Sequence, residues 1–332
     1  MHPRTAGPYT LLRALGPGRV GALHLGRTDK GARVMITIIR AEFTRDPSFL
    51  ACLREDLDLA YRVRSPRVTA VLDGDLQAEL PWLATEYVEA PTMREVLAES
   101  GPLPPEDQQL LGVGLAEALE AIHAAGTAHR DLTPDTVVLA PDGPRVTDLG
   151  IARALVATPL TRGGTLLGTP GYGAPEQIAD GVGEPASDVF ALGTVLVHAA
   201  TARSPFGSGD PVAVFDRVLH SWPVIDGVPP EFAPIVEACL NRDPAERPEP
   251  RQIRDALAGI DLRPTGYPEA IQAQPTAVTR RIGQPSRGCR AFRLTASALQ
   301  MAVLVTLLLA VLHGPAWVEG VAQSIQAALA RF

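Results

Sequence analysis

A short glycine-rich stretch near the N-terminus is the first part of the sequence whose residue types suggest chemistry. The segment LGPGRVG (15–21) places Gly16, Gly18 and Gly21 in a GxGxxG spacing. Glycines let a backbone approach phosphate groups closely, although the same spacing alone also occurs in ordinary turns. Strand-like segments flank it on both sides, whereas a dinucleotide-binding fingerprint opens a helix. The stretch therefore indicates a hairpin that covers phosphates.

A series of motifs follows in the middle of the chain. AHRDLTPDTVVL (128–139) contains a His-Arg-Asp triplet followed by Leu-x-Pro, and VTDLGIA (146–152) brings a second aspartate. GTPGYGAPEQ (168–177) and SDVFALG (187–193) come next, and Arg247 lies in a later ERP triplet. An ordered series of this kind does not arise by chance, so it is far more specific than the glycine spacing alone.

Together these motifs resemble those of a bacterial, eukaryotic-like Ser/Thr protein kinase, over roughly residues 8–260. The resemblance implies an α+β, bilobal fold. A small antiparallel-sheet lobe with one helix would sit on a larger, mainly helical lobe. It also implies that ATP and Mg²⁺, if nucleotide is bound at all, lie between the lobes, and that the γ-phosphate passes to a protein serine or threonine.

The resemblance assigns roles to matching positions. The aspartate that accepts the substrate hydroxyl proton matches Asp131, which follows Arg130, and Thr133 stands at the phosphate-steadying position of the same loop. The metal-binding aspartate of D-F-G matches Asp148, with Leu149 in place of phenylalanine. The positions matched to the nucleotide are Leu15, Gly16, Gly18, Gly21, Leu23, Met35, Thr37, Glu86, Val88 and Val138.

Further matched positions hold the fold or the substrate. In the family, a glutamate equivalent to Glu176 pairs with an arginine equivalent to Arg247. Asp188 matches the buried aspartate that braces the catalytic loop, and Thr169 matches the threonine of the substrate-docking loop. A small gatekeeper, Thr85, precedes the hinge segment.

The strand-like segment ARVMITIIR (32–40) departs from the family where phosphate is held. VMIT aligns with V-A-I-K, so the lysine that grips the α- and β-phosphates is Thr37. A hydrogen bond from a charged group is worth roughly 1.5–3 kcal/mol, about twice a neutral one. The lysine's glutamate partner falls on Asp56, unless the alignment slips to Glu55 or Asp56 is simply a solvated helix residue.

Two more departures affect the metal and the adenine. The asparagine that binds the second metal is Thr136, whose hydroxyl is a poorer magnesium ligand than an amide carbonyl. The lysine that steadies the γ-phosphate is Thr133, although that position varies among kinase classes. Met35 replaces the alanine over the adenine, and its flexible thioether either fills part of the pocket or swings aside.

Other charged or modifiable residues could act at the site. Lys30, the one lysine, lies in the turn before the strand and is expected to face solvent. Arg19 in the glycine loop is better placed to reach a phosphate, although loop side chains are more often exposed. A phosphorylated activation-segment threonine could pair with Arg130, although the default interpretation is that these are ordinary loop threonines. The candidates are Thr158, Thr161 and Thr165.

The elements that must position these residues follow from hydrophobic periodicity. Residues 8–90 are strand-rich with one amphipathic helix around Ser48–Val63, and residues 104–125 and 187–262 indicate helices. The three cysteines are far apart with no CxxC spacing, which favours reduced thiols and no cysteine metal site. The net charge of −7 argues against a nucleic-acid partner.

The C-terminal part has a different composition. Residues 261–293 are rich in Pro, Gln and Arg and indicate a flexible linker. Residues 294–314 contain no charged residue and are long enough for one transmembrane helix; the alternative is a buried core helix. Arginines before this span predict a cytoplasmic kinase-like domain at the bacterial plasma membrane, with residues 315–332 as a short extracytoplasmic tail.

Three functions fit these observations. A membrane-tethered pseudokinase, or very weak kinase, would act by binding a protein partner such as another kinase or its substrate. An active Ser/Thr kinase with displaced phosphate contacts would use Asp131 as base. A membrane adaptor that binds no nucleotide differs from the pseudokinase only in ATP binding. The changes at positions 37 and 136 favour the first function.

Overall fold

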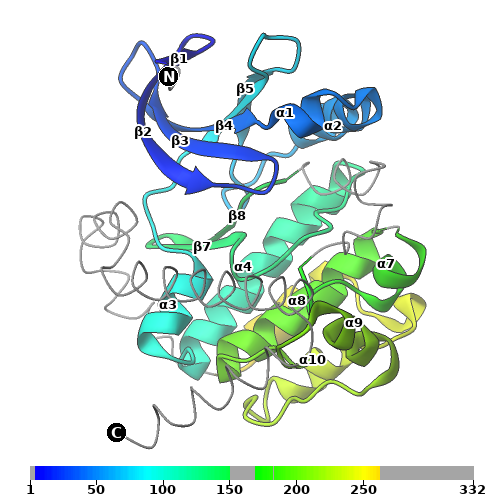
Figure 1. Cartoon of the computed structure of the whole chain (residues 1–332). Helices are drawn as coiled ribbons and strands as arrows, with labels where there is room; N and C mark the ends of the chain where they lie inside the picture. The colour runs from blue at the N-terminus through cyan, green and yellow to red at the C-terminus, as the bar shows by residue number, and fades with distance from the viewer. Residues whose placement is uncertain (1–3, 150–168, 182, 262–332) are drawn as a thin grey trace, which may run out of the picture. The chain divides into compact units, whose positions relative to one another are not determined.

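The computed structural model describes residues 4–149, 169–181 and 183–261 (Figure 1). Its N-terminal lobe is a six-stranded antiparallel sheet in the order β1-β2-β3-β4-β6-β5. The strands are β1 (Thr5–Ala6), β2 (Tyr9–Pro17), β3 (Gly21–Arg27), β4 (Arg33–Ile39), β5 (Val71–Asp75) and β6 (Trp82–Glu86). The predicted sheet lobe is therefore confirmed.

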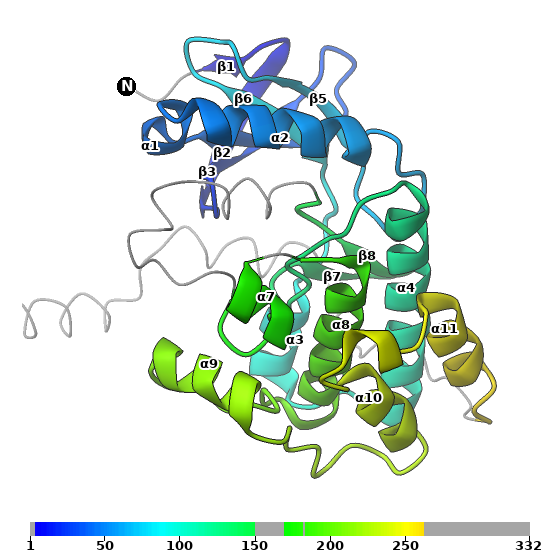
Figure 2. The ribbon, with the colours of Figure 1, turned by 90° about the vertical axis from the view of Figure 1, so that its right-hand side faces the viewer.

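The alternation of β4 decides which side chains face the rest of the protein. Val34 and Ile36 pack with Trp82 on one face of the sheet. Ile39 belongs to the main core together with residues of α2, so Thr37 shares that inner face. Figure 2 shows α2 lying along one face of the sheet.

Two helices, rather than the one predicted, follow β4. They are α1 (Ala41–Thr44) and α2 (Pro47–Ala60). The side chain of Asp46 caps α2 by accepting bonds from two backbone N–H groups, and Pro47 occupies the first turn. α1 is a single turn without a period of its own, which explains why the hydrophobic pattern did not reveal it.

The second lobe is mainly helical, as predicted. Its helices are α3 (Met93–Ser100), α4 (Pro105–Ala124), α7 (Pro175–Asp180), α8 (Pro185–Thr201), α9 (Pro211–His220), α10 (Ala233–Cys239), the 3₁₀ turn η1 (Pro244–Glu246) and α11 (Pro250–Ala258). The sequence over 104–125 predicts an apolar helix face of six residues. Leu111, Leu115, Leu119 and Ile122 of that face are buried, and Leu110 and Val113 are half-buried. Prolines divide the segment expected over 187–262 into separate helices, because proline is tolerated only in a first turn.

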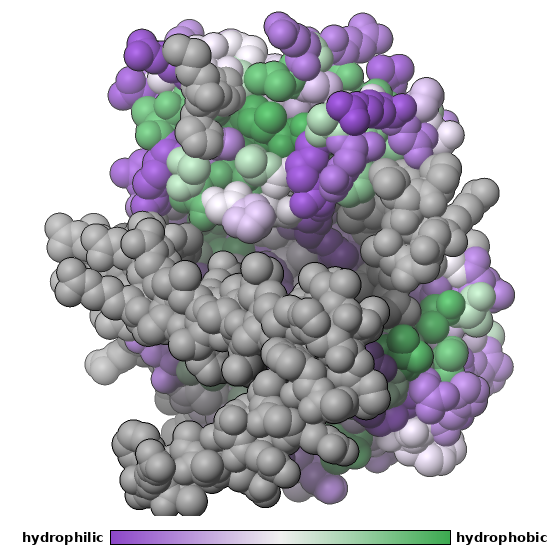
Figure 3. Space-filling model, viewed as in Figure 1, coloured by the Kyte–Doolittle hydropathy of each residue, from purple (hydrophilic) through white to green (hydrophobic). Residues whose placement is uncertain are grey.

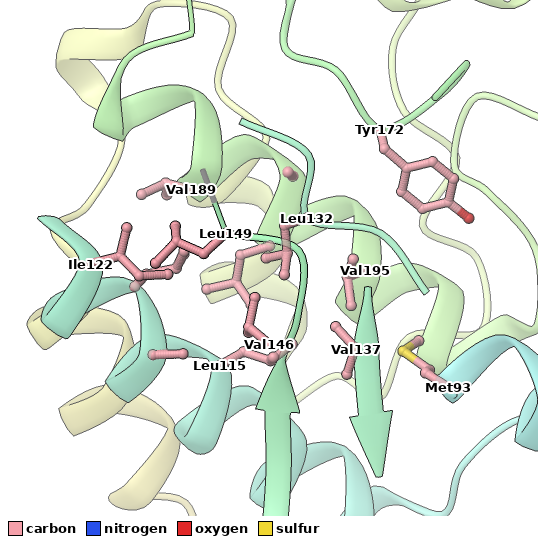
Figure 4. Packing of buried hydrophobic residues seen from close by; sticks show 14 of the residues in the cluster. Met93, Leu115, Ile122, Leu132, Val137, Val146, Leu149, Tyr172, Val189 and Val195 are labelled. Carbon is pink, nitrogen blue, oxygen red and sulfur yellow. The ribbon is translucent and has the colours of Figure 1, made fainter. Parts of the chain in front are cut away.

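A small hairpin carries the central motifs. It consists of β7 (Val137–Ala140) and β8 (Gly143–Val146), and Figure 4 shows its side chains packed among those of α4 and α8. Leu149, in the phenylalanine position of D-F-G, is buried in the same cluster. The hairpin also contacts the chain between α2 and β5, because Thr69 N–H donates to the Val146 carbonyl at 2.9 Å.

Several predicted features lie outside the described residues. These are the activation-segment threonines and segments 294–314 and 315–332, with all but the first residue of 261–293. Within the described residues, no helix is long and apolar enough to span a membrane.

Candidate active site

The catalytic loop is held by one buried aspartate on α8. Asp188 accepts backbone hydrogen bonds from His129 at 2.8 Å and Arg130 at 2.7 Å, and it contacts His123 Nε2 at 2.8 Å. Arg130 has φ of 68°, a left-handed conformation that costs about 1–2 kcal/mol. Two bonds to a carboxylate are together large enough to offset that cost. Asp188 therefore takes the bracing position that the sequence predicted.

Asp131, the predicted base, is nearly buried and is approached from two sides. Its carboxylate accepts a hydrogen bond from Thr169 Oγ1 at 3.3 Å, so the predicted base and the predicted substrate loop are in contact. On the other side, the Arg19 guanidinium forms an ion pair with the same carboxylate. A glycine-loop residue and a substrate-loop residue thus meet at one aspartate.

His129 connects Asp131 with the segment that follows β8 and contains Asp148. Its Nε2 lies 2.8 Å from the Thr147 carbonyl and its Nδ1 accepts from the Asp131 N–H at 3.3 Å. Burial lowers the pKa of His129, so the ring is neutral at neutral pH with its proton on Nε2. Asp148 follows with φ of 63° and an exposed side chain.

Thr136 and Thr133, which stand at the family's metal-binding and phosphate-steadying positions, form hydrogen bonds inside the catalytic loop. Thr136 Oγ1 lies 3.0 Å from the Asp131 carbonyl and 3.1 Å from the Thr133 carbonyl, and it accepts from the Thr133 N–H at 2.9 Å. Thr133 Oγ1 accepts from the Asp135 N–H at 3.3 Å. Both hydroxyls are buried, so they stabilise the loop and are not presented to a metal or phosphate.

One carboxylate of the expected metal-binding pair remains available to a magnesium ion. Mg²⁺ is usually held by one or two carboxylates together with substrate phosphates and water. Asp148 supplies one carboxylate, but the Thr136 hydroxyl is bonded to its own loop and is not free to bind a second ion. Among the described residues, no group of three or more His, Cys, Asp or Glu side chains is placed to hold a metal.

The inner face of the sheet lacks the expected cation. Thr37 is buried on β4, where the family has its lysine. Asp56 on α2 is 1% exposed, whereas Glu55 is exposed, so the register of α2 turns Asp56 inward. Asp56 is therefore not a solvated helix residue: its Oδ1 lies 3.9 Å from Arg130 Nη1 of the catalytic loop.

The predicted adenine-side residues lie along adjoining strands. Leu23 pairs with Thr37 between β3 and β4, and Met35 pairs with the gatekeeper Thr85 between β4 and β6. Leu15, Leu23, Met35 and Val88 are half-buried, and Val138 is buried on β7. The Glu86 carboxylate accepts from Arg145 Nη1 at 2.7 Å, so this side chain serves the hinge fold.

The glycine stretch forms the expected hairpin rather than a helix start. β2 and β3 pair antiparallel, and Gly18 N–H donates to the Gly21 carbonyl at 2.7 Å. A Cβ at Gly21 would collide with the Ile38 carbonyl, while Gly16 adopts φ of +141°. The hairpin conformation itself therefore requires glycine at positions 16 and 21, independently of any contact with phosphate.

A buried ion pair joins the segment after the substrate loop to the end of the helical lobe. Arg247 donates to both Glu176 oxygens, at 2.7 and 2.9 Å, and its side chain is fully buried above the Phe190 ring. Burial raises the pKa of Glu176, but hydrogen bonds from Arg247 and Ser187 outweigh it, and the net pKa is lowered. The predicted pairing of these positions is present.

A groove beside Thr169 was not anticipated from the sequence. Its volume is about 690 Å³, and it is lined by residues of α3, α8, α9 and their loops, including Arg94, Tyr172, His198 and Val214. Tyr172 OH lies 2.6 Å from His198 Nδ1, and burial lowers the pKa of His198 to about 4. Figure 3 shows apolar residues on the helical lobe at the side where α7 and α9 lie. The one sequence feature that could have indicated this groove is Tyr172, which lies in the GTPGYG motif.

This arrangement defines a protein kinase domain, and comparison with known proteins agrees. The family model described as protein kinase domain matches residues 9–256. The chain therefore belongs to the protein kinase family. A solved structure, a point mutant of the PknI kinase domain of Mycobacterium tuberculosis, superimposes with a TM-score of 0.61 at 23% identity, covering 76% of this chain and 96% of that one.

The curated relatives are bacterial Ser/Thr protein kinases. The serine/threonine-protein kinase AfsK of Streptomyces coelicolor is 41% identical over 257 residues, which cover 77% of this chain and 32% of AfsK. The serine/threonine-protein kinase PknL of Mycobacterium tuberculosis is 33% identical over 236 residues, 69% of this chain and 58% of PknL. The chain thus spans about a third of the length of AfsK.

Proposed function

We propose that this chain is a membrane-tethered, Ser/Thr-kinase-like signalling protein in which phosphate transfer is absent or very weak and which acts by binding a protein partner. The carrying observation is Thr136, whose hydroxyl bonds to the backbone of its own loop where the family has a metal ligand. Thr37 is buried at the position of the family's lysine and carries no charge, so a second contact to the phosphates and metal is missing. Loss of one preorganised contact of this kind costs roughly 10²–10³ in rate.

An active Ser/Thr kinase is the second candidate, favoured by a specific set of contacts. Asp188 holds the catalytic loop, Thr169 contacts Asp131, and Arg247 pairs with Glu176. In such an enzyme, Asp131 would accept the proton of the substrate hydroxyl, and ATP with Mg²⁺ would supply the phosphoryl group. The relatives AfsK and PknL are named serine/threonine-protein kinases, which supports this alternative.

The membrane part of the proposal rests on the sequence. Residues 294–314 are free of charge, and six arginines of the preceding segment lie on one side of them. This pattern supports a single span in the bacterial plasma membrane with the kinase domain in the cytoplasm. A partner would then meet the domain at the inner membrane surface, and another kinase or its substrate is the proposed partner.

The test is phosphate transfer by the full chain in mild detergent. Labelled ATP, Mg²⁺ or Mn²⁺ and a generic basic substrate would be compared for the wild type and Asp131→Asn. The proposal predicts incorporation by the wild type no more than marginally above that of Asp131→Asn. Robust incorporation that disappears in Asp131→Asn would establish the active kinase instead.

A further inference from the structure

The tip of the β2–β3 hairpin brings a cation to the catalytic aspartate. The side chain of Arg19 is 31% exposed and pairs with Asp131, whose side chain is 6% exposed. The net pKa of Arg19 is lowered, because burial outweighs the opposing effect of the negative charges of Asp148 and Asp135. The expectation that Arg19 is an exposed loop side chain is therefore not met. Its side chain is only partly exposed and turns inward, towards the aspartates of the site.

The backbone around Arg19 is anchored to neighbouring elements of the sheet lobe. Val20 is 3% exposed in the main core, and its carbonyl accepts from the Arg40 N–H at 2.9 Å. The Arg40 guanidinium donates to the Arg19 carbonyl at 2.7 Å. These contacts tie the hairpin tip to the end of β4, and the Arg19 side chain reaches from this anchored tip to Asp131 of the catalytic loop.

The other arginines near the site are committed to other partners. Arg130 donates to the Gly183 carbonyl at 2.8 Å and to the Ala128 carbonyl at 3.2 Å. Arg94 pairs with Asp135. The lone lysine, Lys30, is exposed in the turn before β4, as predicted. Of the cations discussed, Arg19 is the one that contacts a reactive carboxylate.

We propose that Arg19 takes over the phosphate-binding role of the lysine that Thr37 replaces: it pairs with Asp131 when the site is empty and moves to the phosphates when a nucleotide binds. A guanidinium matches phosphate oxygens through two parallel N–H bonds, and a triphosphate carries more charge than one carboxylate. The exchange frees the Asp131 carboxylate. This inference rests on the nucleotide-binding part of the kinase-like function, and it holds whether or not the protein transfers phosphate.

The test is the affinity of the full chain for ATP and for adenosine, measured by calorimetry in Arg19→Ala and in a matched control, Lys30→Ala. Loss of a charged hydrogen bond predicts an ATP affinity about 10–100-fold weaker in Arg19→Ala. Adenosine affinity should change less than about twofold, because adenosine has no phosphate. Lys30→Ala should match the wild type for both ligands, and Arg19→Lys should retain part of the ATP affinity.

A rescue variant separates a direct contact from a general disturbance. Thr37→Lys in the Arg19→Ala background should restore ATP affinity, because the lysine returns a cation to the family position. Unchanged ATP affinity in folded Arg19→Ala, or equal losses for ATP and adenosine, would overturn the role of Arg19. A folded wild type that binds no ATP would also overturn it, yet would leave a partner-binding pseudokinase intact. Robust phosphate transfer would contradict the proposed function but would leave the phosphate-binding role of Arg19 standing.

Discussion

At the scale of single residues, Thr136 shows how a threonine at the family's metal-ligand position can stabilise the loop that carries it. A threonine hydroxyl is short and readily bonds to backbone groups of its own turn. Here it joins the carbonyls of Asp131 and Thr133, so the catalytic loop keeps its shape without asparagine. The substitution could be read from the sequence, but the direction of the hydroxyl could not, because it depends on the folded loop.

The Glu176–Arg247 pair gives a residue-scale prediction about stability. Glu176→Gln should lower the free energy of unfolding by about 2–3 kcal/mol, because it leaves the fully buried Arg247 guanidinium without a counter-charge. The matched control is Glu89→Gln in the exposed Arg33–Glu89 pair, which has the same 2.7 Å bond and should cost about 0.5 kcal/mol or less. Urea unfolding measures both, and equal losses would contradict burial as the cause.

The same pair should respond to pH in a defined direction. The folded-state pKa of Glu176 is lowered, so its stabilising contribution is present above the unfolded value of about 4.3 and is lost as the pH falls through the folded value. The difference between wild type and Glu176→Gln should therefore shrink below about pH 4. A difference that stays constant into acid would show that the charge is not responsible.

At the scale of elements, the sequence predicted those parts whose pattern is local. The strand over β4 and the apolar face of α4 were visible in the sequence. The choice between Asp56 and Glu55 stayed open until the fold showed Asp56 buried. The short helices α1, α3 and α7 were missed, because one or two turns hold too few residues to show a period. Their existence depends on caps and packing, such as the Thr92–Glu95 capping box of α3.

The same limit explains why Arg19 was misjudged. The glycine hairpin could be predicted from spacing and flanking strands, but the contact of Arg19 joins the hairpin to a loop far along the chain. Loop side chains are exposed more often than not, and no local pattern marks an exception. The anchoring of the tip by Arg40, twenty-one positions away, is likewise a property of the folded sheet.

The first turn of α4 carries an element-scale prediction. Asp107 is fully buried and, within the described residues, neither carboxylate oxygen has a hydrogen-bond partner. Burial, then the charge of Glu106, raises the pKa of Asp107 to about 6. The fold favours the protonated carboxyl, so stability should be lost as the pH rises from about 4 through 6.

Asp107→Asn should remove this pH dependence. At pH 7 it should raise the melting temperature by about 2–4 °C for each kcal/mol that the ionised carboxylate costs, and near pH 4 it should have little effect. Asp58→Asn on the exposed side of α2 is the control and should show neither change. A variant that melts below the wild type at pH 7 would mean that ionised Asp107 stabilises the protein.

At the scale of the whole molecule, the prediction concerns the membrane topology of the segment that follows the kinase domain. If residues 294–314 span the membrane, a reporter enzyme fused to the C-terminus should be active only outside the cytoplasm. A matched fusion after residue 261, which omits the span, should give activity only inside. A full chain that stays soluble without detergent, or a cytoplasmic C-terminal reporter, would contradict the predicted topology.

The central claim of the proposed function is that phosphate transfer is absent or very weak because Thr37 and Thr136 replace the family's lysine and asparagine in an otherwise kinase-like fold. The most direct measurement compares phosphate transfer by the wild type with that of the double variant Thr37→Lys/Thr136→Asn, in the full chain. The account predicts a gain of about 10²-fold or more in the double variant, abolished by adding Asp131→Asn. A wild type that already transfers phosphate as fast as the folded double variant would contradict the account.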